Sequence, residues 1–108
     1  MGAIAMPISP DKLDAWKAWL ADLTGPRKEE FEASNARHDL TGHRAWLQVN
    51  PDGSYLAIAV HDGPGGDTYV MSLAQSDDPF DQWMMGSLAN AHGVDPSGPM
   101  PPAPEQFL

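Results

Sequence analysis

The chain has 108 residues, no cysteine and a formal net charge of −9. The absence of cysteine excludes disulfide bonds, thiolate nucleophiles and cysteine metal sites. All six lysine and arginine residues lie within the first 44 positions, so we expect no basic stripe that would bind nucleic acid or an anionic membrane surface. The first residues contain neither a basic leader nor a long apolar run, and we expect a cytoplasmic protein without a membrane span.

The first third of the chain predicts one strand and two helical segments. Residues 3–8 alternate small and large side chains, as a short strand does. Ser9 is a suitable N-cap for the first helix, with Pro10 at its first position. The apolar stripe of this helix comprises Leu13, Trp16, Leu20 and Leu23. A second helical segment is predicted from residue 26 to about residue 37, with Thr24 as its N-cap.

Residues 45–49 and 55–60 predict the two strands of an antiparallel hairpin. Between residues 45 and 60 the chain carries one charged side chain, Asp52, which lies in the turn. A strand pair with one face in water alternates apolar and polar residues, and this pair does not. Both faces are therefore expected to be covered. Since the predicted helices suffice for one face, we expect a partner subunit, a ligand or both on the other.

Two registers are compatible with the hairpin. The turn sequence favours a type I turn with a bulge at Gly53, in which Asn50 pairs with Ser54. That register groups four residues on one face: Trp46, Gln48, Leu56 and Ile58. A four-residue loop pairs Val49 with Ser54 instead. It separates an aliphatic face (Leu47, Val49, Leu56, Ile58 and Val60) from a face with polar tips (Trp46, Gln48, Tyr55, Ala57, Ala59 and His61). We favour this second register, because a buried face specifies register strongly.

The rest of the chain predicts a glycine-rich connection, a last helix and a tail. Residues 61–66 are a flexible connection. Residues 67–75 are weakly helical, and within them Thr68-Tyr69-Val70 is equally compatible with a strand. The sequence Ser76-Asp77-Asp78-Pro79 is typical of a helix start, and Gly93 of a helix end. The predicted buried stripe of this helix comprises Phe80, Trp83, Met84 and Leu88. Its carboxylates are explained by capping and by the helix dipole.

The order of elements, β-α-β-β-α, is that of a ferredoxin-like α+β fold, an antiparallel sheet with helices on one face. We assign residues 1–93 to this domain and residues 94–108 to a proline-rich C-terminal tail, in which a last strand is doubtful and the final Phe107-Leu108 is free to pack on the body or on a neighbour.

The chain is similar to the dimeric α/β-barrel superfamily, which includes antibiotic-biosynthesis-monooxygenase-like proteins. Three internal stretches and the chain end carry the resemblance: Trp46-Leu47-Gln48, Pro51-Asp52-Gly53, residues 76–83 and residues 101–106. The resemblance implies a homodimer packed sheet to sheet, with a ligand bound between each sheet and its helices. It transfers no catalytic motif and indicates no cofactor.

Four hairpin residues are the candidates for a ligand-binding site or a dimer interface: Trp46, Gln48, Tyr55 and His61. His61, at a strand end beside the glycine-rich connection, is also the candidate general base. The remaining histidines, His38, His43 and His92, are interpreted as structural or exposed. No metal site is expected, because no third ligand converges on His38 and His43, the two histidines predicted to lie in a loop.

These observations favour a small homodimeric protein that binds an apolar or aromatic small molecule. One alternative is a cofactor-independent monooxygenase or polyketide-cyclase-like enzyme, in which His61 moves a proton and His61→Ala abolishes turnover. Another is a structural or interaction dimer whose second sheet face is wholly used in dimerisation.

Overall fold

The computed structural model describes residues 1–95, 98 and 104–108. The strands are β1 (Gly2–Ile8), β2 (Gly42–Val49) and β3 (Tyr55–Asp62). The helices are α1 (Leu13–Thr24), α2 (Lys28–Arg37), α3 (Tyr69–Gln75) and α4 (Pro79–His92). Short 3₁₀ turns, Pro10–Lys12 and Gly66–Thr68, precede α1 and α3. The predicted order of strands and helices is therefore confirmed, and of the two alternatives left open for the segment before residue 75 the structure has the helix, from Tyr69 to Gln75.

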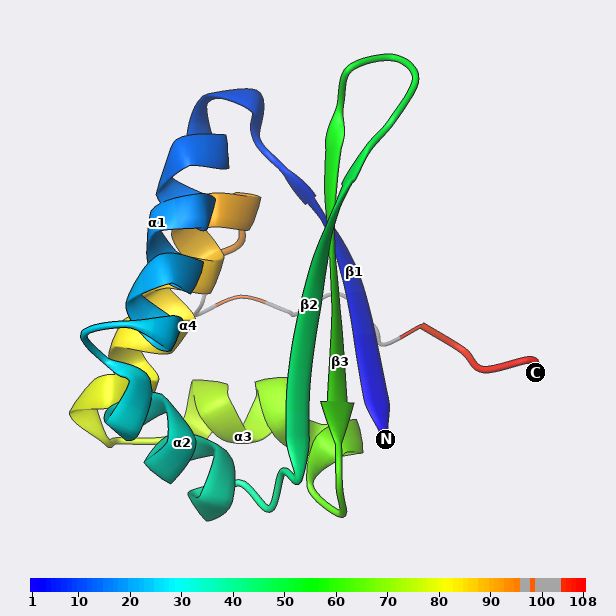
Figure 1. The fold of residues 1–108 in the computed structure, drawn as a ribbon. Coiled ribbons are helices and arrows are strands. Elements are labelled where there is room, and N and C mark those ends of the chain that lie inside the picture. Colours follow the sequence, from blue (N-terminus) through cyan, green and yellow to red (C-terminus); the bar gives the residue numbers. More distant parts are fainter. Residues whose placement is uncertain (96–97, 99–103) are drawn as a thin grey trace.

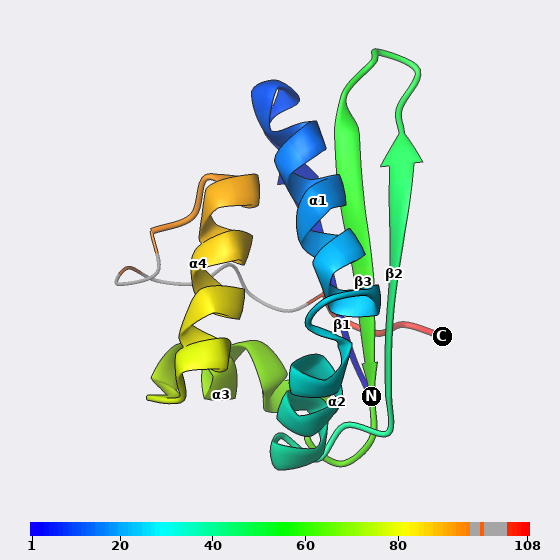
Figure 2. The same cartoon turned by 60° about the vertical axis from the view of Figure 1, so that its left-hand side comes forward.

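The three strands form one open antiparallel sheet in the order β1-β3-β2. The helices lie along one face of this sheet, and both views leave its other face without a helix in the described part of the chain (Figure 1; Figure 2). This arrangement is the predicted α+β class. Among the described residues of the tail no strand is present, and Phe107 and Leu108 are exposed instead of packing on the body.

The hairpin adopts the register that follows from its turn, and the favoured pairing of Val49 with Ser54 is wrong. Val49 pairs with Tyr55, and the backbone N–H of Asn50 donates to the carbonyl of Ser54 at 2.8 Å. Gly53 has a φ of +85°, as the glycine of a type I turn with a bulge requires. The conformations that Pro51 and Gly53 require therefore determine the register, and the burial of one aliphatic face does not.

Because of this register, small side chains of the central strand face the helices. Ala57 pairs with Met6 of β1 and is buried under the helices, together with Met6. Side chains alternate along a strand, so Leu56, Ile58 and Val60 face the other way. The predicted aliphatic layer beneath the helices is therefore wrong. The helices supply the bulk of the core themselves, and small strand residues make room for it.

That bulk comes from amphipathic helices that follow the predicted stripes. In α1 Trp16 and Leu23 are buried, and Leu13, Trp19 and Leu20 are partly buried against the core. In α4 the buried apolar residues are Phe80, Met84, Met85, Leu88 and Ala91, while Trp83 is partly buried. Apolar residues three and four positions apart share one face of a helix, which is why these two stripes meet the sheet.

The ends of α4 agree with the sequence, whereas two other predicted caps do not form. The carboxylate of Asp78 accepts from the backbone N–H groups of Phe80 and Asp81, and Gly93 closes the helix with a φ of +66°. The side chain of Ser9 makes no cap hydrogen bond. The hydroxyl of Thr24 donates back to carbonyls of its own helix, so Thr24 does not cap α2.

The glycine-rich connection between β3 and α3 is tightly packed. A Cβ atom on Gly65 would lie 1.8 Å from the carbonyl oxygen of His38, and one on Gly66 would lie 2.1 Å from that of His61. Glycine is therefore required where these backbones touch. This close packing brings the first residue of α3, Tyr69, beside the end of β3.

None of the helices in the described part of the chain combines the length and the apolar character that a membrane crossing requires.

Candidate functional site

A cavity of about 230 Å³ lies between the sheet and the helices. Its apolar wall includes Trp19 and Leu20 of α1, Met84 and Leu88 of α4, and Ala59 of β3. None of the described residues that line it is a lysine, arginine, aspartate or glutamate. An apolar cavity of roughly 150 Å³ is enough to hold benzene, so this one has room for a somewhat larger ring compound.

One end of the cavity is polar, and three rings from different elements meet there. His43 of β2 and His61 of β3 form a cross-strand pair with ring centroids 4.6 Å apart. Tyr69 of α3 lies 4.5 Å from His61 and 5.2 Å from His43, again between ring centroids. We call these three residues the polar corner. Antiparallel pairing of β2 and β3 places the two histidines side by side, and the packed glycines place Tyr69 against them.

Both histidines of the polar corner are neutral at physiological pH. Burial lowers the pKa of His43 to about 3, and the neighbouring His61 acts in the same direction. Burial also lowers the pKa of His61 to about 4, against the opposing charge of Asp62. The side-chain oxygen of Asn35 lies 3.2 Å from His43 Nδ1, within hydrogen-bond distance.

Tyr69 is 3% exposed, and its hydroxyl is the buried side-chain polar atom without a hydrogen-bond partner among the described residues. Burial raises the pKa of Tyr69, and the charge of Asp81 raises it further. The hydroxyl is therefore protonated and able to donate. Burying a polar group without a partner costs free energy, and such groups are rare enough in folded proteins to mark sites of interest.

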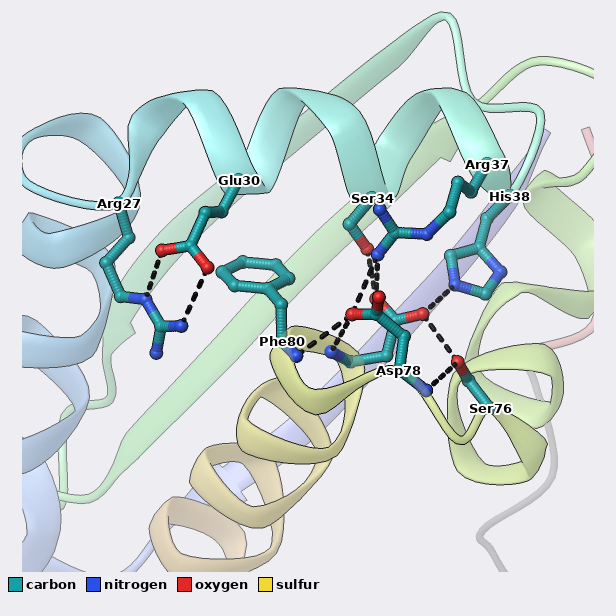
Figure 3. A network of polar contacts seen from close by, with 9 residues as sticks. Arg27, Glu30, Ser34, Arg37, His38, Ser76, Asp78 and Phe80 are labelled. Atoms are coloured by element: carbon teal, nitrogen blue, oxygen red, sulfur yellow. Dashed lines mark hydrogen bonds and ion pairs between the residues drawn. The ribbon is translucent and has the colours of Figure 1, made fainter.

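A second buried polar group, Asp81 of α4, lies close to the polar corner. Asp81 is 1% exposed. Its Oδ1 accepts from the hydroxyl of Ser34 at 2.5 Å and from Arg37 at 3.0 Å. Its Oδ2 accepts from the hydroxyl of Ser76 at 2.6 Å and lies 2.9 Å from His38 Nε2. Figure 3 shows the side chains of Ser34 and Arg37 of α2, of His38 directly after α2, and of Ser76 converging on the start of α4.

The Asp81 cluster (Asp81 with Ser34, Arg37, His38 and Ser76) ties three segments together and is charged. Burial alone would raise the pKa of Asp81, but hydrogen bonds from Ser34, Ser76 and His38 and the charge of His38 lower it to about 2. The ring of His38 also lies edge-on to Tyr69, with centroids 5.6 Å apart. His38 is therefore the member of the Asp81 cluster that contacts the polar corner.

The structure does not bring the four predicted hairpin residues together. His61 is 2% exposed and lies in the polar corner, on the helix side of the sheet. Tyr55 faces the same side at the far end of the strand, where it packs beside Ile8 and Ala57. Trp46 and Gln48 lie on the opposite, open face, where Trp46 is 47% exposed. Their shared face followed from the wrong register, whereas a role for each in ligand or partner binding stays a prediction.

Three functional candidates were missed by sequence reasoning. His43 was interpreted as a loop residue, but β2 begins at Gly42 and includes it. Tyr69 was placed in a weakly helical segment with no assigned role. Asp81 was explained by helix capping, although Asp78 does the capping and Asp81 is buried. Asp81 lies three and four residues before Met84 and Met85 and so shares the apolar face of the helix, which was the one available signal for its burial.

The described residues hold no group of three or more histidine, aspartate or glutamate side chains that is arranged to bind a metal ion. The class defined by fold and site is a small α+β protein with an open three-stranded antiparallel sheet and a sheet–helix cavity. Compared with protein-family models, the chain matches none, and no curated protein matches it.

Proposed function

We propose that this protein binds an apolar or aromatic small molecule in the cavity between its sheet and its helices. The observation that carries the proposal is a cavity of about 230 Å³ whose described lining is largely apolar and holds no lysine, arginine, aspartate or glutamate. Ligand pockets are typically apolar with a few placed polar groups, and that description fits this cavity. The position of the cavity is also the one that the resemblance to the dimeric α/β-barrel superfamily implies.

Binding is better supported than catalysis by His61. A general base works best with a pKa near the operating pH. His61, with a pKa of about 4, is neutral but only weakly basic at pH 7. The predicted enzyme also used Trp46 and Gln48 beside the substrate, and these residues lie on the other face of the sheet.

The proposal is tested by a substitution that fills the cavity with a larger side chain. Ala59 lines it from the central strand, between Ile4 of β1 and Ala45 of β2. The neutral fluorescent probe N-phenyl-1-naphthylamine should bind the wild-type protein saturably, one molecule per chain. Ala59→Leu should weaken binding at least tenfold, because the added side chain occupies the space of the ligand.

Ala15→Leu is the matched control, because Ala15 is exposed on α1 and does not line the cavity. This variant should bind the probe as the wild type does. Circular dichroism should show both variants folded. Equal binding by a folded Ala59→Leu variant would overturn the proposal.

We also propose that the open face of the sheet pairs with the same face of a second copy, which would give the dimeric α/β barrel. Leu56, Ile58 and Val60 of the central strand share this face with the half-exposed Trp46. Its charged pair, Arg44 with Asp62, lies at one end of the strands and is joined at 3.0 Å. An apolar face with an aromatic residue near its centre is typical of an interface between identical subunits.

Ile58→Glu should convert the dimer to a monomer, because it would bury a charge in the centre of the interface. Ala18→Glu is the control, since Ala18 is exposed on α1. Light scattering at micromolar concentration should give twice the monomer mass for the wild type and the control, and the monomer mass for Ile58→Glu. A monomeric wild type would refute the dimer without affecting the cavity.

A further inference from the structure

The ring of His61 makes no hydrogen bond with any of the described residues. The other three histidines each have a partner within 3.2 Å: a carboxylate for His38, an amide oxygen for His43 and a backbone carbonyl for His92. His61 is nevertheless 2% exposed. Because a buried polar group without a partner costs free energy, His61 is a wall residue from which a ligand can gain a hydrogen bond.

The ring nitrogens of His61 are accessible, whereas the hydroxyl of Tyr69 is not. Among the described residues, that hydroxyl is the fully sealed side-chain polar atom without a partner. The nitrogens of His61 also lack a partner but are not sealed, so they keep a small accessible surface. Since His61 lines the cavity from the helix side of the sheet, a ligand in the cavity lies within reach of its ring.

The chemistry of a neutral imidazole limits which ligand suits this ring. His61 is uncharged at pH 7, because burial lowers its pKa to about 4. A neutral imidazole has one N–H donor and one bare nitrogen acceptor. A hydroxyl group both donates and accepts, so it can bond whichever nitrogen it meets, whereas a carbonyl oxygen can bond only the N–H. No lysine or arginine lines the described wall, so a carboxylate would lose its hydration without gaining a cationic partner.

We propose that the cavity selects uncharged apolar compounds that carry a hydroxyl group, which forms a hydrogen bond with the ring of His61. This inference rests on the proposed function and adds the chemical class of the ligand. Contacts with the rings of His43 and Tyr69, at centroid distances of 4.6 and 4.5 Å, hold the ring of His61 in place. The apolar wall of α1 and α4 contacts the rest of the molecule.

The experiment measures the binding of three naphthalene probes by equilibrium dialysis at pH 7. The probe 2-naphthol carries a neutral hydroxyl group, 2-methylnaphthalene has a methyl group in its place, and 2-naphthoate is an anion. His61→Phe keeps a ring but removes both nitrogens, so the affinity for 2-naphthol should fall about tenfold and the affinity for 2-methylnaphthalene should change by less than about twofold. The wild type should bind 2-naphthoate at least about tenfold more weakly than 2-naphthol.

Tyr55→Phe is the matched control, because Tyr55 lies on the same strand and faces the helices but does not line the cavity. It should bind all three probes as the wild type does. A second measurement uses the wild type alone and therefore does not depend on the folding of a variant. In protein with isotope-labelled histidine, 2-naphthol should shift the ring-nitrogen NMR signals of His61 further than 2-methylnaphthalene does.

The outcomes separate this inference from the proposed function. Wild-type affinity for 2-naphthol in a folded His61→Phe variant would overturn the role of His61 and leave the cavity as a binding site. Ring-nitrogen signals of His61 that respond equally to the two neutral probes would do the same. Binding of 2-naphthoate as tight as that of 2-naphthol would overturn the selection for uncharged ligands. Failure of the wild type to bind either neutral probe would overturn both proposals.

Discussion

The Asp81 cluster and the polar corner are two buried polar groups that share a neighbour, His38, yet they are built differently. Both carboxylate oxygens of Asp81 have two partners each, contributed by α2 and by the segment that precedes α4. The hydroxyl of Tyr69 has none among the described residues. A fully satisfied buried network stabilises one arrangement of its elements, whereas an unsatisfied group lowers stability. The comparison therefore separates a buried polar group that stabilises the fold from one that lowers its stability.

The largest expected effect comes from removing the acceptor of the satisfied cluster. Asp81→Ala leaves the Ser34 hydroxyl, which is fully buried, without its partner and removes the ion pairs with Arg37 and His38. We expect the free energy of unfolding to fall by about 4 kcal/mol, measured by urea denaturation. Asp77→Ala is the control, because Asp77 is exposed in the same segment, and it should change stability by less than about 0.5 kcal/mol. A loss below about 1 kcal/mol in Asp81→Ala would contradict the structural role.

Acid should affect the polar corner before it affects the Asp81 cluster. In the unfolded chain histidine binds a proton near pH 6.5, but His43 and His61 stay neutral in the folded protein down to about pH 3 and pH 4. The unfolded state thus binds more protons in this range, and stability must fall as the pH falls below 6.5. Between pH 7 and pH 5 we expect a loss of about 4 kcal/mol from the two histidines together.

The double variant His43→Gln with His61→Gln should flatten this pH dependence in urea denaturation at a series of pH values. His92 also has a pKa lowered by burial, despite its bond to the Pro7 carbonyl, but it is present in both proteins and its contribution cancels. Asp81, with a folded pKa of about 2, stays charged through the whole range. An unchanged slope in the double variant would show that the polar corner is not the acid-sensitive part.

The smallest expected effect is an increase in the free energy of unfolding. Tyr69→Phe removes the hydroxyl that has no partner, so the unliganded protein should become more stable by about 1 kcal/mol. Tyr55→Phe, in which the hydroxyl is only partly buried, should leave stability within about 0.5 kcal/mol of the wild type. Thermal denaturation measures both variants. A loss of stability in Tyr69→Phe would mean that this hydroxyl serves the fold, as the carboxylate of Asp81 does.

Local signals in the sequence predicted the elements well. Asp78, Pro79 and Gly93 mark the two ends of α4 as predicted, whereas the caps predicted at Ser9 and Thr24 do not form. The turn at Gly53 likewise contained the correct register, which was set aside in favour of a burial argument. That argument assumed that aliphatic strand residues lie under the helices. It failed because the helix side chains already fill most of that space.

The functional residues were harder to predict, since each depends on contacts distant in sequence. Asp81 meets Ser34 across 47 positions and His38 across 43. The polar corner needs β2, β3 and α3 to meet. His61 was selected from the sequence for its place at a strand end, and that place is why it reaches the corner.

The sequence by itself determined the order of strands and helices, the turn of the hairpin and the uncharged character of both of its faces. The tertiary structure decided which of those faces lies beneath the helices. It also decided that the cavity ends at Tyr69 and that Asp81 is buried. The physical reason is the sequence distance over which each interaction acts. Caps, turns and periodicity depend on a few neighbouring residues, whereas burial and hydrogen-bond satisfaction depend on every element that packs around a group.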